Sequence, residues 1–216
     1  MALPSSLTQP RACAILDSIK GMFATKGFDG ASMQDLARAA GMSAGNFYRY
    51  FNSKNAIVEA MIQRDLDEVQ NEFTLIMQSK NPLETLRVLI RHRIDLPPED
   101  HGPIWAEIEA TAARRPEIAA LLARMETEIT RNLVAVFARI ASVSVETAEQ
   151  RFTAHAGLIL MLIQGLTIRS GCAIASGTRG PDHALAALVM ATIERTLAEI
   201  AAPGAQTTPN FAESSA

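Results

Sequence analysis

The stretch Met33–Phe51, MQDLARAAGMSAGNFYRYF, decides how the rest of the chain is interpreted. Two short helical segments meet there at a tight turn that contains Gly41, since glycine adopts a positive φ without the steric penalty of a Cβ. Ala37 is small enough for the second segment to approach the first, and Ser43 can cap the second segment by accepting a hydrogen bond from a backbone N–H. The stretch therefore predicts a helix-turn-helix unit, whose second helix enters the major groove of DNA.

Helix-start and helix-stop residues place further helices on both sides of this stretch. A helix over 10–26 is followed by Gly27, where a left-handed cap favours glycine, and Ser32 opens the next helix with a capping-box pattern. Ser53 starts a long helix that meets no breaker until Asn81–Pro82. No stretch predicts a strand, and the same signals place later helices near 82–95, 102–113, 116–140, 145–171 and 181–201. The sequence therefore predicts an all-α protein of nine helices.

The composition of the 216 residues is that of a folded protein with an uneven charge distribution. Apolar residues make up 48% and charged residues 20%, enough to build a packed core, and the formal net charge is −3. Residues 1–55 carry six Lys and Arg against three Asp and Glu, whereas the remainder carries 14 against 20. This asymmetry indicates an anion-binding module joined to an acidic body.

Several classes of protein are disfavoured by what the sequence lacks. Cys13 and Cys172 are expected to be reduced thiols, and the four histidines show no metal-ligand spacing, so neither a metal nor another cofactor is expected. The amino-terminus lacks a signal-peptide pattern, and the apolar run over 156–168 is shorter than a membrane span, so we expect a cytoplasmic protein without a membrane partner. No nucleophile–base pair is evident, and Glu107 and Glu109 lie on different helix faces, so we expect no catalytic residues and no enzyme.

The region from about Arg11 to Glu59 resembles the TetR family of bacterial transcriptional regulators. The resemblance rests on the segments Phe23–Phe28, Ser32–Ala37, Ala40–Phe51 and Ser53-Lys54. It implies a helix-turn-helix DNA-binding domain of three helices over 1–55 and a helical ligand-binding and dimerisation domain over 56–202. Residues 203–216, rich in Pro, Gly, Ser and Thr, are expected to form a disordered tail.

The same resemblance implies a function and its partners. It implies a homodimer that binds a palindromic operator in double-stranded DNA, acts as a repressor and is released by a small-molecule effector. The last two helices would form the dimer interface, where small residues such as Ala184, Ala187 and Ala191 would allow close packing.

The resemblance also implies roles for residues in and around the second helix of the unit. An Asn46 amide can pair with adenine N6 and N7, Ala44 can touch a thymine methyl group, and Gly45 permits close approach of the backbone. Gln34 corresponds to another position that can reach a base edge. Contacts with phosphates, which set register without reading sequence, are expected from Ser32, Tyr48, Tyr50 and Lys54. Ser43, which caps the second helix, is also expected to contact DNA.

The sequence of the second domain carries fewer recognisable motifs, and it predicts only the approximate location of a ligand site. A cavity is expected among the middle helices, with walls from Trp105, Met125, Ile129, Phe152 and His155 and with Glu109 as a polar anchor. The scarcity of basic residues there favours a neutral or apolar effector. Two alternatives stay open: a DNA-binding regulator without a small-molecule ligand, controlled by a protein partner or by redox chemistry, and, less favoured, an all-α enzyme.

Overall fold

A computed structural model describes residues 10–96, 98–177 and 182–202. This described part of the chain contains nine α-helices and no strand, so the all-α prediction is confirmed. The expected disordered tail over 203–216 lies outside the described residues. The helices are α1 Pro10–Gly30, α2 Met33–Ala39, α3 Ala44–Tyr48, α4 Lys54–Gln78, α5 Pro82–Asp95, α6 Pro98–Ala112, α7 Pro116–Ala141, α8 Val145–Ala175 and α9 His183–Ala201.

Most helix starts lie where the capping residues predicted them. The side chains of Ser32, Ser43, Ser53 and Asn81 each accept a hydrogen bond from a backbone N–H in the first turn of the helix that follows. The helix expected to end at Gly171 instead continues to Ala175. Residues within a few positions of each helix start therefore set most of the boundaries.

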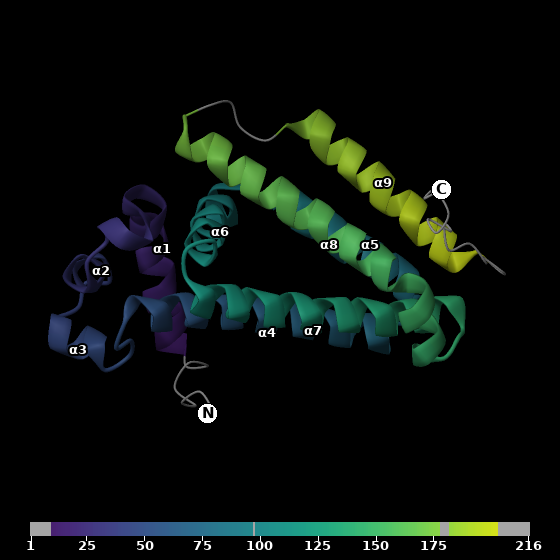
Figure 1. The fold of residues 1–216 in the computed structure, drawn as a ribbon, viewed down its shortest axis with the longest axis horizontal. Helices are drawn as coiled ribbons and strands as arrows, with labels where there is room; N and C mark the ends of the chain where they lie inside the picture. The colour runs from purple at the N-terminus through teal and green to yellow at the C-terminus, as the bar shows by residue number, and fades with distance from the viewer. Residues whose placement is uncertain (1–9, 97, 178–181, 203–216) are drawn as a thin grey trace, which may run out of the picture.

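The helices form an elongated bundle with the three amino-terminal helices at one end (Figure 1). Helices α4 and α7 run side by side along the length of the molecule, and α8 and α9 run together over the opposite side. Helix α6 lies between these layers and also packs against α1. It therefore connects the amino-terminal helices to the rest of the bundle.

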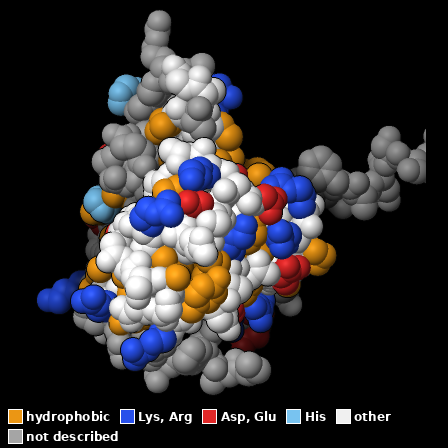
Figure 2. Space-filling model, turned by 90° about the vertical axis from the view of Figure 1, so that its left-hand side faces the viewer, with side chains coloured by type: hydrophobic (Ala, Val, Ile, Leu, Met, Phe, Trp, Pro, Cys, Tyr) orange, Lys and Arg blue, Asp and Glu red, His pale blue; other side chains and the backbone are white. Residues whose placement is uncertain are grey.

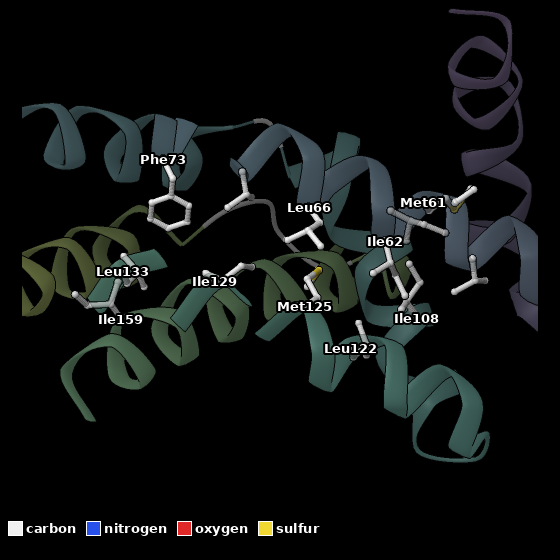
Figure 3. Close-up of a cluster of buried hydrophobic side chains, with 14 of the residues drawn as sticks. Met61, Ile62, Leu66, Phe73, Ile108, Leu122, Met125, Ile129, Leu133 and Ile159 are labelled. Atoms are coloured by element: carbon white, nitrogen blue, oxygen red, sulfur yellow. The ribbon is translucent and has the colours of Figure 1, made fainter. Parts of the chain in front are cut away.

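The core of the larger body lies between α4 and α7 and is made of branched aliphatic side chains, methionine and phenylalanine. Figure 3 shows Leu66 and Phe73 of α4 facing Met125 and Ile129 of α7, with Ile159 of α8 beside them. All five side chains are buried. This packing holds the middle helices at fixed positions around the cavity described below.

Helices α6 and α8 cross at a contact between two glycines. A Cβ added to Gly102 would lie 2.8 Å from the Cα of Gly171, and one added to Gly171 would overlap the carbonyl group of Gly102. The helix predicted near 145–171 therefore runs through Gly171 to Ala175, and the missing side chain of Gly171 is what lets the backbone of α6 approach. The crossing sets the position of α6 relative to the rest of the bundle.

Helix α8 is long and apolar enough, by length and composition, to cross a membrane over Val145–Ile174. Its Phe152, Ala156 and Ile159 are buried against the bundle, where α8 packs on α6 and α7. These contacts identify α8 as a helix of the bundle, and of its other large apolar side chains Val145 and Met161 are exposed.

Candidate DNA-binding surface and ligand cavity

The first helix of the predicted helix-turn-helix unit begins with a complete capping box. The backbone N–H of Asp35 donates to the Ser32 hydroxyl at 3.1 Å, and the Asp35 carboxylate accepts from the Ser32 hydroxyl at 2.8 Å and from its backbone N–H at 3.2 Å. Hydrogen bonds from the Ser32 side chain and backbone hold the pKa of Asp35 below its usual 3.8. Ser32, expected near a phosphate, therefore fixes the start of α2.

The turn between α2 and α3 has the geometry that the glycine predicted. Gly41 has a φ of 65°, and no atom lies within 4 Å of where its Cβ would be, so the backbone angle rather than lack of space requires glycine. The N–H of Met42 donates to the carbonyl of Ala37 at 2.9 Å, and the N–H of Gly41 donates to that of Arg38 at 3.0 Å. These two bonds form a Schellman motif, which ends α2 and aims α3 away from it.

Helix α3 has one buried side and one open side. Phe47 is fully buried, and its ring lies 5.8 Å from the ring of Phe51, which anchors the helix to the core. Tyr48 is 48% exposed on the opposite side. Of the other residues expected to contact DNA, Gln34, Ser43, Ala44 and Gly45 are exposed, and Asn46 and Tyr50 are partly exposed. The predicted base-reading positions are therefore accessible from solvent.

The end of the molecule that carries α2 and α3 also carries basic side chains. Figure 2 shows this end, with Lys and Arg side chains distributed around it. Arg38 and Arg49 are both exposed, and Arg38 lies 3.3 Å from Asp35. Such a surface suits a polyanion, because each base can neutralise a phosphate.

Lys54 has intramolecular partners that the sequence did not reveal. Its Nζ donates to the carbonyl oxygen of Phe28 at 2.7 Å and to that of Asp29 at 3.3 Å, and it lies 5.0 Å from the centre of the Phe28 ring. The ammonium therefore ties the start of α4 to the end of α1. A phosphate contact remains a prediction and would use the remaining N–H of the same ammonium group.

Glu107 and Arg115 also bind the region where α1 meets α4, and the sequence did not indicate these contacts. The backbone N–H of Phe28 donates to Oε1 of Glu107 at 2.5 Å, beside Gly27, whose φ of 70° breaks the helical path of α1. Arg115 donates to Asp29 at 2.9 Å and its guanidinium lies 4.8 Å from the Phe28 ring centre. No local motif marks Glu107 or Arg115, since their partners lie 79 and 86 positions away in the sequence. We call Phe28, Lys54, Glu107 and Arg115 the Phe28 joint.

A cavity of about 330 Å³ lies among the middle helices, with walls from α4 through α9. Its lining is largely apolar and includes Phe73, Ile90 and Leu160. A site for a small organic molecule typically has such walls with a few polar groups. Four of the six predicted ligand contacts line the cavity, namely Trp105, Glu109, Met125 and Ile129.

The prediction that Phe152 and His155 also belong to the cavity wall is wrong for this cavity. Phe152 is buried, and its ring meets the edge of Phe137 at a centroid distance of 6.3 Å. His155 packs against Phe152, and its Nε2 lies 3.8 Å from Glu199 of α9. The rotation of α8 about its axis turns Ile159 and Ile163 toward the cavity instead.

Arg93 and Glu109, two charged side chains that line the cavity, have different electrostatic surroundings. Arg93 lies 3.6 Å from Asp65 and 3.4 Å from Glu72, so its charge is matched within the wall. Glu109 is partly buried, and burial, followed by the nearby charge of Glu126, raises its pKa.

The comparisons with known proteins agree with this geometry. Residues 15–61 match the family model described as "Bacterial regulatory proteins, tetR family", and residues 82–198 match the model described as "BetI-type transcriptional repressor, C-terminal". The HTH-type transcriptional regulator UidR of Escherichia coli (strain K12) is 28% identical over 127 residues, which cover 56% of this chain and 62% of that protein. The HTH-type transcriptional repressor KstR2 of Rhodococcus jostii (strain RHA1) is 30% identical over 69 residues, which cover 32% of this chain and 34% of that protein.

Solved structures share the fold over almost the whole chain. Salmonella enterica GusR superposes with a TM-score of 0.67 at 23% identity, covering 90% of this chain and 100% of that chain. A transcriptional regulator from Rhodococcus sp. RHA1 gives a TM-score of 0.65 at 20% identity, covering 88% and 97%. The second family model alone covers more than half of the sequence, and the first covers the helix-turn-helix unit. The chain therefore belongs to the TetR family of bacterial regulatory proteins.

Proposed function

We propose that this protein is a ligand-responsive repressor that binds a palindromic operator as a homodimer. Residues 1–55 would bind DNA, and residues 56–202 would bind the effector and form the dimer. The observation that carries the proposal is the position of α6, because it lines the cavity through Trp105 and Glu109 and reaches α1 through Glu107. A bound molecule in the cavity would thus contact the same helix that holds the DNA-binding end.

The dimer is supported by an apolar surface that the single chain leaves uncovered. Met161 of α8 is 60% exposed and Leu188 of α9 is 62% exposed. The same two helices also carry exposed small residues, namely Ala154, Gly157, Gly165, Ala184, Ala187, Ala191 and Ala198. We call this set the α8–α9 face. Its small residues allow close helix packing, and two copies of one face suit a two-fold axis that matches a palindrome.

Release from DNA would follow from a change in the spacing of the two α3 helices. Successive major grooves on one face of DNA are about 34 Å apart, so a dimer binds only when its recognition helices have that separation. An effector that prefers another position of α6 would displace the Phe28 joint, and through Lys54 the start of α4. The effector acts only to the extent that its affinity differs between the two arrangements.

The test is selection of bound sequences from a random DNA pool with the purified protein. A palindromic consensus is expected, and an Asn46→Ala variant should lose preference at one position in each half-site, at a cost of about 1–3 kcal/mol. Its affinity for non-specific DNA should stay unchanged, because phosphate contacts supply that term. Selection of no consensus, or of a consensus without symmetry, would contradict the proposal.

A further inference from the structure

Helix α3 presents Gly45 and Arg49 on the side that faces directly away from the core. Phe47 is fully buried, and Gly45 and Arg49 each lie two positions from it, which places both about 160° around the helix from Phe47. Arg49 is the C-cap of α3 and keeps helical backbone angles, with a φ of −70° and a ψ of −26°. Both residues are exposed, so they form the middle of the open side of α3.

The side chain of Arg49 differs from the other basic side chains of this region, because it has no partner within the described residues. Four Lys and Arg lie between positions 26 and 54. Lys26 and Arg38 pair with Asp35 at 3.5 and 3.3 Å, and Lys54 donates to two backbone carbonyls. Among the described residues, no carboxylate lies within 4.0 Å of the guanidinium of Arg49, and no hydrogen bond holds it. Its N–H groups are therefore available to a ligand.

The guanidinium of Arg49 can reach over Gly45. Side chains of an α-helix lean toward its N-terminus, and residues four positions apart lie on the same face. Gly45 has no side chain, and apart from its chain neighbours no other side chain lies within 4 Å of where its Cβ would be. Arg49 can therefore extend along α3 toward the first turn, which is the part of a recognition helix that contacts base edges.

The residues already expected to read bases leave guanine without a matching side chain. Ala44 and Gly45 have no hydrogen-bonding side chain. Asn46 and Gln34 carry amides, which pair with N6 and N7 of adenine. Arginine presents two N–H groups in a rigid fork that matches O6 and N7 of guanine, the commonest specific contact in the major groove. Arg49 would therefore supply the recognition of guanine that these four residues lack.

We propose that Arg49 reads a guanine in each half-site of the operator, through two hydrogen bonds to O6 and N7, and is a specificity-determining residue of this protein. This inference rests on the proposed function, because it requires α3 to lie in the major groove. The residues to which the resemblance assigns DNA contacts do not include Arg49. Its alternative role, a contact with a phosphate, would set register without reading sequence.

The first experiment compares the sequences that the wild type and Arg49→Ala select from a random DNA pool. We expect the wild type to select a guanine at one position of each half-site, with a preference of about tenfold or more over the other bases. Arg49→Ala should accept all four bases at that position and keep the preferences at the others. A wild-type consensus without guanine would overturn the proposal, and so would selection of the same guanine by a folded Arg49→Ala protein, checked by circular dichroism.

The second experiment needs no variant to bind DNA, because it changes one atom of the selected guanine. In 7-deazaguanine a C–H group replaces N7, and the base still pairs with cytosine. We expect this base to weaken binding of the wild type about fivefold or more, since one of the two bonds from Arg49 is lost. Any binding of Arg49→Ala should be unaffected by it. Equal affinity of the wild type for the two operators would overturn the proposal.

Arg38→Ala is the matched control for loss of a positive charge. It removes an exposed guanidinium from α2, at the same end of the molecule, which Figure 2 shows. We expect it to lower affinity for all DNA sequences alike and to keep the guanine in the consensus, because a phosphate contact carries no sequence information. If Arg49→Ala behaved in the same way, Arg49 would contact a phosphate and the proposal would be wrong.

The outcomes keep this inference separate from the proposed function. If the wild type selects a palindrome and Arg49→Ala keeps the same guanine, the assignment of Arg49 is wrong and the operator-binding proposal stands. If the wild type selects no consensus at all, the operator-binding proposal fails, and the role of Arg49 fails with it.

Discussion

Lys54 shows how one side chain can belong both to the fold and to the candidate DNA-binding surface. Its ammonium donates to the carbonyls of Phe28 and Asp29, at the point where α1 ends and α4 begins. Tyr48, by contrast, is 48% exposed, and its hydroxyl has no partner among the described residues. The two residues are expected to contact phosphates, but their loss should have different consequences for the folded protein.

We expect Lys54→Ala to lower both stability and affinity for every DNA sequence, because it removes the bonds to the two carbonyls as well as a positive charge. The loss of stability should be about 1–3 kcal/mol. Tyr48→Phe should lower DNA affinity alone, since it removes only an exposed hydroxyl. Urea unfolding and DNA titration over a range of salt concentrations measure both effects. A Lys54→Ala protein as stable as the wild type would show that the two carbonyl bonds contribute little.

The capping box gives a pH-dependent prediction at the same scale. Bonds from Ser32 hold the pKa of Asp35 below 3.8, so the ionised carboxylate stabilises the folded state above pH 3.8. This contribution is lost as the pH falls through the lowered pKa of the folded state. Asp35→Asn should therefore be less stable than the wild type at pH 6, and the difference should shrink as the pH falls below 3.8. Urea unfolding at a series of pH values tests this, and a difference independent of pH would contradict it.

Among the helices, α6 contacts three different parts of the molecule: α1, the cavity and α8. Glu107 and Glu109 lie on different faces of this helix, as expected, and they point to different places: Glu107 bonds to Phe28, and Glu109 lines the cavity. The glycine crossing with α8 holds the start of the same helix. A displacement of α6 by a ligand would therefore act on α1 and α8 together.

The crossing predicts that Gly171→Ala is destabilising. A Cβ at this position would overlap the carbonyl of Gly102, so α6 must move away from α8, at a cost of about 1–3 kcal/mol or more. Gly21→Ala on α1 is the matched control, because nothing lies within 4 Å of the added methyl group. The control should be neutral or stabilising by about 0.5–1 kcal/mol. Urea unfolding measures the free energy of unfolding of the two variants. Equal stabilities would show that the close approach of α6 and α8 at Gly102 and Gly171 is not required.

For the molecule as a whole, the α8–α9 face is the surface that we propose joins two copies and so brings two recognition helices together. Helix α8 is long and apolar, yet much of it is only partly buried in one copy. A second copy would bury this surface, and binding to both halves of a palindrome would depend on it.

Leu188→Glu should therefore weaken the dimer, because it would place an unpaired charge in an apolar interface. Sedimentation equilibrium should show a shift toward monomer, and affinity for the operator should fall at least about tenfold. Leu75→Glu is the control, since Leu75 is 58% exposed on α4 and lies outside the α8–α9 face. Its dimer should persist. A Leu188→Glu protein that stays fully dimeric would place the interface elsewhere.

The all-α class, most helix starts and the helix-turn-helix unit could be predicted from the amino-acid sequence. These features depend on residues within about four positions of one another, as with Ser32 and Asp35 or Ala37 and Gly41, and a linear pattern records such contacts. The expectation of a cavity among the middle helices named six residues, of which four line the cavity that the structure contains.

Other features became known only from the packing of the helices. They are the partners of Lys54, the role of Glu107, the continuation of α8 through Gly171 and the exclusion of Phe152 and His155 from the cavity wall. Each depends on where two helices far apart in the sequence cross and on how each is rotated about its axis. A difference of one residue in an α-helix turns a side chain by about 100°, so helical periodicity separates the buried from the exposed side without specifying which neighbour a buried side chain meets.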